Sequence, residues 1–343
     1  MADSVNIVSY NGDEVISLFG KWKNLILAVV LAWVAPVIIF TIFWNEDTVV
    51  SEKIINEAVD TVSTTDHEIG KQTIRVLMDN NTVVQMDIED YVVCVVLREM
   101  PAEFETEALK AQAVVARTYT LRRCANNSKH QNADICTSPS CCQGFYDKQT
   151  YVKDGGSEQL ILKVEEAVYA TKSQVLLYNG ELIDATYFSC SGGRTEDAVA
   201  VWGTNIPYLQ STDSPGEESA LRYTDTVEFS VSEFARLLEL NKSDIAGNWI
   251  GNISYTKGGG VDKITLSGKS FKGTDIRTRL GIRSTAFTIS INGDNIVITT
   301  KGFGHRVGMS QYGADAMALQ GSSYKEILNH YYKDVVLSEY SGN

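Results

Sequence analysis

Glu99 is the side chain in this sequence with the clearest setting for proton-transfer chemistry. It lies in the stretch VVLREMPAEF, in the last turn of a predicted helix that Pro101 must end. A helix C-terminus carries partial negative charge and disfavours a nearby anion. The neighbouring Leu97, Met100 and Phe104 would bury the carboxyl, and burial also favours its protonated form. A carboxyl that keeps its proton near neutral pH is suited to general-acid cleavage of an acetal.

Sulfur and imidazole side chains gather in one short segment. Of the six cysteines, four lie between Cys124 and Cys142, and His130 lies among them in HQNADICTSPSCCQGFY. The spacing matches no standard zinc finger, but thiolates combined with an imidazole are ligands that zinc prefers. Disulfides, which would pair Cys136 with Cys141 or Cys124 with Cys142, are the alternative in an oxidising compartment. The segment therefore predicts either a zinc site or a local disulfide.

The segment GFGHRVGMSQYGA near the C-terminus combines glycines with polar and aromatic side chains. Glycines allow a backbone to approach a ligand closely, and such side chains suit sugar hydroxyls and sugar faces. A tight corner between a strand and a helix is the structural alternative, and both can hold together. A similar turn around SCSGG is less specific. The candidate sugar-binding residues of the two segments are Tyr187, His305, Ser310, Gln311 and Tyr312.

The composition restricts the partners that this chain can have. Its formal net charge of −13 and its pI near 4.8 argue against nucleic acid, because binding to phosphates needs basic faces. Four histidines in 343 residues limit imidazole chemistry. A hydrophobic content of 44% excludes a wholly disordered chain. We therefore expect a folded protein with no nucleic-acid partner.

The elements that must position Glu99 form an α+β pattern. Residues 73–88 predict two short strands, and apolar residues at helical spacing then predict a helix over 90–100. A second helix follows over 102–124, with Leu109, Ala113 and Ala116 on one face. From about residue 160, strand patterns with Asn-Gly and Gly-Gly turns dominate. The expected fold is α+β, with a helix-rich part followed by a strand-rich part.

An apolar segment precedes this folded part. Residues 25–44 contain no charged residue and could cross a bilayer as a helix of about 30 Å. Lysines precede the segment and acidic residues follow it, which places the N-terminus in the cytoplasm. No small-residue cleavage site follows, as a secretory signal would require. We expect a cytoplasmic tail over 1–24, one transmembrane helix over 25–44, a stalk over 45–72 and a catalytic domain over 73–340.

Five separated motifs occur in the order typical of one protein family. They are LREMP, EALKAQAVVARTY, YFSCSGGRTE, VWGTNIPYLQS and GFGHRVGMSQYGA. In these motifs the chain resembles the stage II sporulation protein D family of lytic transglycosylases, over about residues 85–335. The resemblance implies cleavage of the MurNAc–GlcNAc bond in peptidoglycan glycan strands, to a 1,6-anhydro product, in septal and engulfment wall remodelling during endospore formation. It also implies that Glu99 is the catalytic acid.

The same resemblance suggests further site residues. Arg117 matches an important arginine of the family and would orient Glu99 or bind an N-acetyl or lactyl group through its guanidinium. Tyr208 fits the family pattern, whereas Gln210 stands where the family commonly has lysine, which puts a cationic role at that position in doubt. Arg306 departs from the family in the closing motif, where glycine is usual.

The resemblance also points to a set of zinc ligands. Family members from clostridial spore formers resemble the cysteine-rich segment and bind zinc through it, which points to His130, Cys136 and Cys142. Another histidine or cysteine can occupy the place of Cys141 there. Because an acid mechanism needs no Lewis acid, we expect such a zinc to be mainly structural.

The implied partners are peptidoglycan glycan strands, a membrane-anchored wall amidase and other engulfment proteins, with a homodimer as a further option. The chain would be a single-pass membrane protein whose catalytic domain lies on the wall side. The family acts on strands stripped of stem peptides, and the negative charge of this chain agrees with that preference. Two alternatives stay open: a non-catalytic, glycan-binding amidase enhancer, and a muramidase that uses water.

Overall fold

The computed structural model describes residues 72–126, 129–221 and 223–341. The predicted cytoplasmic tail and transmembrane helix, and the predicted stalk up to residue 71, lie outside the described residues. Within the ranges that are described, no helix has both the length and the apolar character needed to cross a membrane.

Helix α2 (Ile88–Glu99) presents Glu99 as its last residue, and both of its ends follow from the local sequence. Asp87 begins the helix by accepting a hydrogen bond from the backbone N–H of Glu89. Met100 is extended, as expected for a residue that precedes a proline, so the helix cannot continue past Glu99. The position of the candidate acid is therefore set by a few neighbouring residues.

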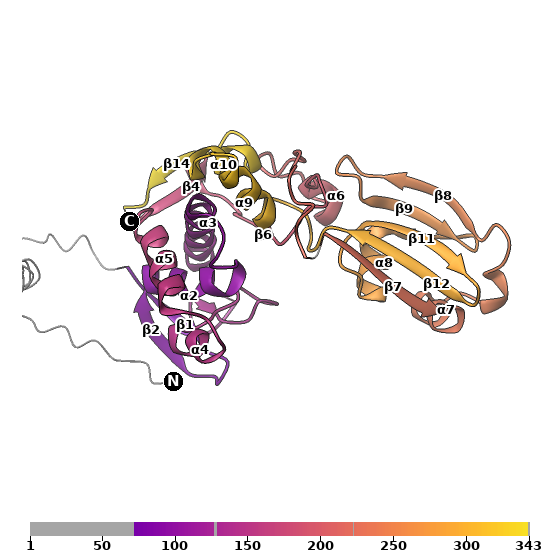
Figure 1. Ribbon diagram of the computed structural model, residues 1–343, viewed down its shortest axis with the longest axis horizontal. Helices are drawn as coiled ribbons and strands as arrows, with labels where there is room; N and C mark the ends of the chain where they lie inside the picture. The colour runs from indigo at the N-terminus through magenta and orange to yellow at the C-terminus, as the bar shows by residue number, and fades with distance from the viewer. Residues whose placement is uncertain (1–71, 127–128, 222, 342–343) are drawn as a thin grey trace, which may run out of the picture. The chain divides into compact units, whose positions relative to one another are not determined.

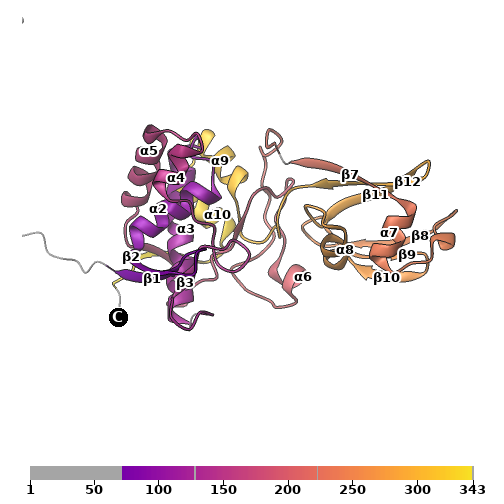
Figure 2. The ribbon, with the colours of Figure 1, turned by 90° about the horizontal axis from the view of Figure 1, so that it is seen from below.

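Helix α3 (Thr106–Ala125) is the centre of the first hydrophobic core. It contacts α2, α5, α9, α10 and the strand β4 (Figures 1 and 2). The predicted packing face is confirmed, because Leu109, Ala113 and Ala116 are fully buried. The bounds of the remaining helices are α4 (Lys148–Lys153), α5 (Glu158–Tyr169), α6 (Ala198–Trp202), α7 (Val231–Leu238), α8 (Gly273–Leu280), α9 (Gln311–Leu319) and α10 (Tyr324–Tyr331).

The described strands form five small sheets rather than one continuous sheet, in the orders β2-β1-β3, β14-β4-β5, β13-β6, β11-β12-β7 and β10-β9-β8. The parallel pair β6 and β13 joins residues 187–188 to residues 309–310, and thus brings two predicted binding segments together. The strand bounds are β1 (Thr73–Leu77), β2 (Val83–Asp87), β3 (Ile135–Cys136), β4 (Gln174–Tyr178), β5 (Glu181–Leu182), β6 (Tyr187–Phe188), β7 (Thr224–Ser230), β8 (Ile250–Tyr255), β9 (Val261–Leu266), β10 (Lys269–Lys272), β11 (Ala286–Asn292), β12 (Asn295–Lys301), β13 (Met309–Ser310) and β14 (Val336–Glu339).

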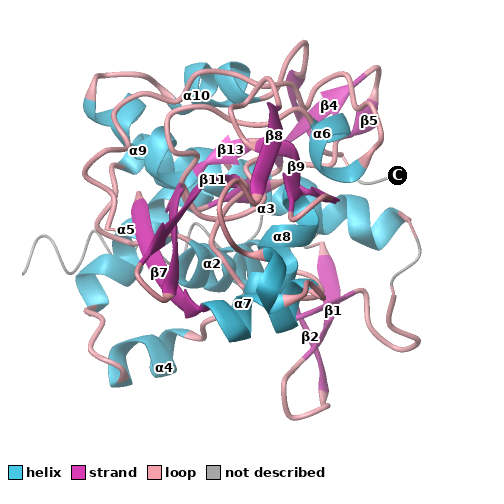
Figure 3. Ribbon diagram, turned by 90° about the vertical axis from the view of Figure 1, so that its right-hand side faces the viewer, coloured by secondary structure: helices cyan, strands magenta, loops and turns pink. Residues whose placement is uncertain are grey.

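Residues 224–301 form a region with a hydrophobic core of its own. The region contains β7 to β12 with α7 and α8 packed on them (Figure 3). Its two ends are neighbours, because Thr224 in β7 lies opposite Lys301 in β12. A region whose chain enters and leaves at adjacent positions can be added to a fold without separating the segments on either side.

Arg117 lies inside the first core rather than beside Glu99. Its Nη2 is 2.5 Å from Oε2 of Glu89, in an ion pair whose two side chains are at most 3% exposed. The guanidinium also donates to the carbonyl oxygens of Val168 and Gln174. This placement disagrees with the expectation that Arg117 orients the acid or binds a sugar. Its donors instead hold α2, the end of α5 and the start of β4 against α3.

The α+β class predicted from the sequence is confirmed, and so are the first hairpin and the two long helices. The expected order, helices first and strands later, is incomplete. Helices α7 and α8 lie among the later strands, and α9 and α10 follow them. Each of these four helices has only eight or nine residues, so an apolar pattern has too few turns to separate helix from strand.

The variant Glu89→Gln tests the structural role of the buried ion pair. It leaves the Arg117 guanidinium buried without a counter-charge, so the free energy of unfolding should fall by about 3–5 kcal/mol. The matched control is Glu239→Gln, which removes the partner of Arg279 in an exposed pair and should cost less than about 1 kcal/mol. Urea unfolding of the full chain measures both. Equally small losses would contradict a structural role.

Candidate active site

A cavity of about 910 Å³ opens where α2 ends. Its lining includes Glu99 and four of the predicted sugar-binding residues, Tyr187, His305, Gln311 and Tyr312. The predicted zinc ligand Cys142 also lines it, and so do residues that were not selected from the sequence, among them Arg98, Tyr119, Arg123, Gln143 and Phe303. Among the described residues of this lining, only Glu99 carries a carboxylate. The cavity is therefore the candidate active site.

The Glu99 carboxyl is partly buried and has three polar neighbours. Its Oε1 accepts a hydrogen bond from the backbone N–H of Gly144 at 2.5 Å, and the Tyr187 hydroxyl donates to the same carboxyl. Burial raises the pKa of Glu99, while the Gly144 bond, the charge of Arg98 and the Tyr187 hydroxyl oppose this effect in part. Glu99 thus holds its proton to a higher pH than a solvated glutamate. The same neighbours would stabilise the carboxylate once the proton has left.

Gly144 approaches Glu99 closely because it has no side chain. A Cβ atom at this position would lie 2.6 Å from Cγ of Arg98 and 2.9 Å from Oε1 of Glu99. Both distances are too short for a stable contact, so a larger residue would push the loop away from the carboxyl. The loop follows directly after Cys141 and Cys142, and it therefore links the cysteine-rich segment to the acid.

The closing motif contacts the same helix end from another direction. Gln311, the first residue of α9, donates from Nε2 to the carbonyl oxygen of Glu99 at 2.8 Å. This bond satisfies a carbonyl that the end of a helix leaves without an intrahelical partner. Tyr312 packs against Phe104 at a steep angle, with ring centroids 5.0 Å apart. Two segments that are distant in the sequence are thereby held together.

His305 is a partly buried imidazole in the cavity lining. Its Nδ1 accepts a hydrogen bond from the backbone N–H of Val307 at 3.1 Å, so in the neutral ring the other nitrogen carries the proton. The ring centroid lies 5.4 Å from that of Trp202 and 5.6 Å from that of Phe188. Burial lowers the pKa of His305 to about 4, and the charge of Arg277 acts in the same direction. At neutral pH His305 is a stacking and hydrogen-bonding group.

Ser310 is absent from the described lining of the cavity and belongs to a buried network around Glu217. The Glu217 side chain is 1% exposed, and its Oε2 accepts from the backbone N–H groups of Ser191 and Gly192, both at 2.9 Å. Its Oε1 accepts from the hydroxyls of Ser214 and Ser310. One carboxylate therefore ties the SCSGG turn to the closing motif.

Two further residues predicted to bind sugar lie elsewhere. The Tyr208 hydroxyl accepts from the backbone N–H of Asp184 at 3.0 Å, and its ring packs against Tyr178. Gln210 is exposed and donates to the carbonyl oxygen of Pro207 at 2.7 Å. Neither is among the residues that line the cavity. Tyr208 contributes to the core, and Gln210 stabilises a local turn.

Arg306, which stands where glycine is usual, has a positive φ of 65°. An L-residue with a side chain is disfavoured in this left-handed conformation, which glycine adopts freely. The arginine side chain is buried and makes several contacts in compensation. It pairs with Glu196 at 3.2 Å and donates to the carbonyl oxygens of Ser191 and Gly258 at 2.6 and 2.7 Å. The arginine in place of glycine thus adds a buried ion pair and several hydrogen bonds that hold the closing motif.

His130, Cys136, Cys141 and Cys142 place one ligand atom each within 4.8 Å of one another. Nε2 of His130 lies 3.8 Å from Sγ of Cys141 and 3.6 Å from Sγ of Cys142, and these two sulfurs are 3.9 Å apart. Ligands held tetrahedrally at about 2.0–2.3 Å from zinc would be separated by about 3.4–3.8 Å. The spacing fits such a site with Cys141 as a fourth ligand, and all six cysteines are free of disulfides.

The residues that were missed could have been found only in part. Arg98 is next to Glu99 in LREMP, so its nearness to the acid follows from the chain itself. Tyr119 and Arg123 are four residues apart on α3, which places them on one helix face. Nothing in the sequence indicates that this face, rather than that of Arg117, lines the cavity.

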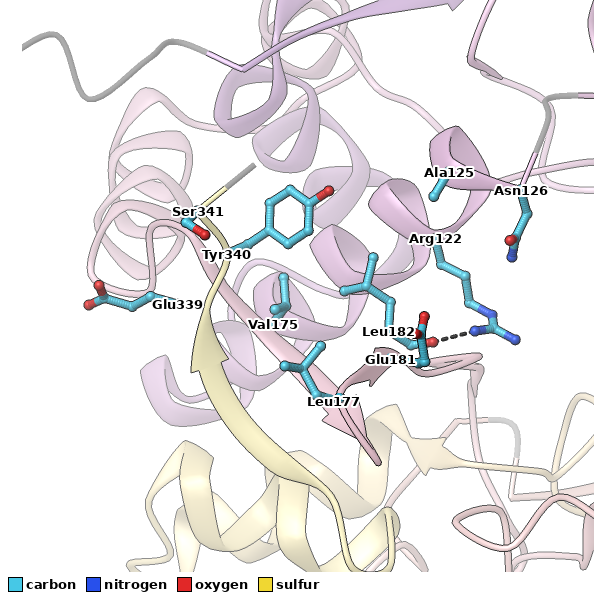
Figure 4. A pocket seen from close by; sticks show the side chains of 11 residues that line it. Arg122, Ala125, Asn126, Val175, Leu177, Glu181, Leu182, Glu339, Tyr340 and Ser341 are labelled. Carbon is cyan, nitrogen blue, oxygen red and sulfur yellow. Dashed lines mark hydrogen bonds between the residues drawn. The ribbon is translucent and has the colours of Figure 1, made fainter. Parts of the chain in front are cut away.

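A second cavity, of about 310 Å³, lies beside the end of α3, near β4, β5 and β14 (Figure 4). Its arginine, Arg122, donates to the carbonyl oxygen of Leu182 (Figure 4). Arg122 also pairs with Asp184 at 3.1 Å. None of the predicted site residues is among those that line it. The larger cavity therefore remains the candidate active site.

The variant His305→Gln tests the neutral histidine. The pKa of His305 is about 4 in the folded chain and about 6.5 in an unfolded one, so the unfolded state binds a proton that the folded state does not. The free energy of unfolding should therefore fall as the pH decreases from about 6.5 to about 4, by at most about 3 kcal/mol. In the variant, the free energy of unfolding measured in urea should no longer show the part of its pH dependence that comes from His305. An unchanged pH dependence would contradict the assignment.

Comparisons with known proteins place this chain in a family. The family model described as SpoIID, stage II sporulation protein, matches residues 78–178. The stage II sporulation protein D of Bacillus amyloliquefaciens is 42% identical over 266 residues, or 76% of each chain. That of Bacillus subtilis (strain 168) is 40% identical over 266 residues, covering 76% of this chain and 77% of the relative. The amidase enhancer of Bacillus subtilis (strain 168) is 30% identical over 299 residues, covering 72% of this chain and 40% of that protein. The chain belongs to the stage II sporulation protein D family, which is involved in sporulation.

Proposed function

We propose that the protein is a lytic transglycosylase that cleaves MurNAc–GlcNAc bonds in glycan strands stripped of stem peptides, in septal and engulfment wall remodelling during endospore formation. One observation carries the proposal: Glu99 is a partly buried carboxyl with a raised pKa, and it is the one carboxyl in the described lining of a large cavity. The other groups around it include tyrosine hydroxyls, an amide and an imidazole, which suit sugar hydroxyls and sugar faces.

The proposed reaction uses Glu99 twice. Its carboxyl first donates a proton to the glycosidic oxygen as the bond from that oxygen to C1 breaks. The muramic 6-hydroxyl then attacks C1 and gives its proton to the Glu99 carboxylate. The product is a 1,6-anhydro sugar, and no water is consumed. Between the two steps, the Gly144 N–H, the Tyr187 hydroxyl and the charge of Arg98 would stabilise the carboxylate.

The single carboxylate favours this route over hydrolysis. Glycosidases that use water generally carry two carboxyl groups, about 5–5.5 Å apart when they retain configuration and about 6.5–9.5 Å apart when they invert it. The described lining of the cavity offers no second carboxylate near Glu99. An internal hydroxyl of the substrate can replace both a second carboxylate and the water.

The alternative is a non-catalytic amidase enhancer that binds glycan. The 30% identity to a protein of that name supports this reading. A binding scaffold does not need a carboxyl with a raised pKa in its cavity, whereas an acid catalyst does. We therefore favour the enzyme.

We further propose that His130, Cys136 and Cys142, with Cys141 as the fourth ligand, hold a structural zinc ion. Three soft thiolates and an imidazole suit zinc, and the spacing of the ligand atoms fits its coordination. When bound, the ion would neutralise the thiolates and cross-link the loop. Because that loop continues to Gly144, zinc would help to position the N–H group that bonds Glu99.

The proposed location follows from residues outside the described part of the chain. The apolar segment 25–44 would anchor the protein in the cell membrane with its N-terminus in the cytoplasm. The catalytic domain would then face the wall, where a membrane-anchored amidase and other engulfment proteins are the proposed partners. A second copy of the chain remains a further candidate.

The variant Glu99→Gln tests the acid. It keeps the shape of the side chain but removes the proton, so cleavage should fall by about 10²–10⁴-fold or more, while binding of stripped strands persists. Mass spectrometry should detect 1,6-anhydro ends, which are one water lighter than hydrolysed ends, with the wild type only.

Glu103→Gln is the matched control, because Glu103 is exposed and absent from the cavity lining. It should cleave like the wild type. Near-wild-type turnover by Glu99→Gln would exclude Glu99 as the acid, and hydrolysed ends from the wild type would favour a muramidase. Strand binding without any cleavage would favour the amidase enhancer.

Removal of a ligand tests the zinc. His130→Ala or Cys136→Ser should release about one zinc per chain and lower the unfolding temperature, with activity falling as the Gly144 loop loses its position. Cys124→Ser is the control, since Cys124 is outside the ligand group. Elemental analysis of protein prepared under reducing conditions measures the bound zinc, and thiol counting measures the reactive cysteines. A chain without zinc, with two cluster cysteines unreactive until reduced, would favour the disulfide.

A further inference from the structure

The candidate active site has the opposite charge to the chain as a whole. The chain carries a formal net charge of −13, yet Arg98 and Arg123 line the cavity with Glu99 as the one acidic group in its described lining. His305 is neutral there, because burial lowers its pKa to about 4. With Glu99 protonated, the charged groups that remain are both cations. An anionic part of a ligand would be attracted to this cavity.

Neither cavity arginine forms an ion pair with any described residue. The guanidinium of Arg123 lies over the Tyr119 ring, 4.9 Å from its centroid, and that of Arg98 lies 5.7 Å from the centroid of Tyr146. Other arginines of the same body are paired: Arg117 with Glu89, Arg306 with Glu196, and Arg122 with Asp184. Arg123 therefore keeps donors for a ligand of the larger cavity. Arg98 is shared, because it also lines a neighbouring cavity of about 520 Å³ that contains Tyr146 and three aspartates.

The planar guanidinium of arginine can bind a carboxylate in a bidentate manner, through two parallel hydrogen bonds. A neutral sugar ring would not use this charge, but a muramic residue carries a lactyl group. In a peptide-bearing strand, the lactyl carbonyl belongs to an amide and has no charge. Hydrolysis of that amide leaves a free carboxylate on each muramic residue. Removal of the stem peptide thus gives the strand a carboxylate, which is a suitable partner for an arginine in the cavity.

We propose that Arg123, together with Arg98, binds the free lactyl carboxylate of a muramic residue from which the stem peptide has been removed. This assignment rests on the proposed function and names the groups that make stripped strands the better substrate. It also places the reaction after an amide hydrolysis, because only that class of reaction supplies the carboxylate. The acidic remainder of the chain would repel the carboxylates of intact stem peptides.

Arg123 allows a cleaner test than Arg98. Arg98 is next to Glu99 in the chain, and its charge lowers the pKa of the acid, so its loss would change catalysis as well as binding. Arg123 is not among the groups that shift the pKa of Glu99. Substitution of Arg123 should therefore raise KM and leave kcat nearly unchanged.

The experiment compares two substrates with the zinc-loaded full chain in detergent. One is stripped glycan strands with free lactyl carboxylates, and the other is the same strands with those carboxylates converted to methylamides. We expect the wild type to show a KM about 10- to 100-fold higher for the methylamide strands, the range typical of a charge-assisted hydrogen bond. Arg123→Gln should raise KM on the free strands by a similar factor and should no longer distinguish the two.

Two further variants serve as controls. Arg123→Lys should fall between the wild type and Arg123→Gln, because an ammonium keeps the charge but lacks the planar fork. Arg236→Gln removes an exposed arginine that is outside the cavity lining, and it should behave like the wild type. Urea midpoints equal to that of the wild type would confirm that the Arg123 variants are folded.

Calorimetric binding of both strands to the Glu99→Gln full chain separates this proposal from the proposed function. If the wild type cleaves neither strand but binding still weakens on methylamide conversion, and does so only while Arg123 is present, the carboxylate site stands without the activity. If Arg123→Gln keeps the discrimination of the wild type in both KM and affinity, the proposal is overturned. Equal binding and cleavage of the two strands by the wild type would overturn it as well.

Discussion

Removal of the Glu99 carboxyl from water is the constraint on which the cavity depends. Helix α2 delivers the residue to a place where the Gly144 loop contacts the side chain and Gln311 of the closing motif holds the backbone. Each contact comes from a different part of the sequence, so the raised pKa of Glu99 is a property of the assembled fold. If either of these two segments moved away, the carboxyl would be exposed to solvent, and its pKa would return towards that of an ordinary glutamate.

Two buried charged side chains fix the segments that line the cavity but have little regular structure. Glu217 accepts from backbone N–H groups of the SCSGG turn and from the hydroxyl of Ser310, the N-cap residue of α9. Arg306 donates to backbone carbonyl oxygens and pairs with Glu196. Moving either segment would leave buried donors or acceptors unsatisfied, which is costly in a low-dielectric interior. The hydrogen bonds and the ion pair of these two buried side chains thus hold the segments in place where the described residues form little regular helix or sheet.

The histidine–cysteine cluster and the acid belong to one continuous piece of chain. Between α3 and α4 the only regular element in the described residues is the two-residue strand β3, so few backbone bonds hold this segment. Cys142 lines the cavity, and Gly144 bonds Glu99 two residues later. A cross-link at the cluster, such as the zinc that we propose, would stabilise the site without taking part in proton transfer.

The sequence by itself determined the α+β class, the end of the first helix just before Pro101 and the closeness of the cluster residues, because each depends on neighbours along the chain or on simple periodicity. It could not determine which candidates line the cavity. Arg117 and Arg123 lie on one helix, six residues apart, and so project about 120° from each other. Both are arginines in a helix of small and apolar residues, and local pattern gives no reason to choose between them. The packing of α2, α5 and β4 buried Arg117 in an ion pair and left Arg123 at the cavity, since only long-range contacts decide which face of a helix meets the core.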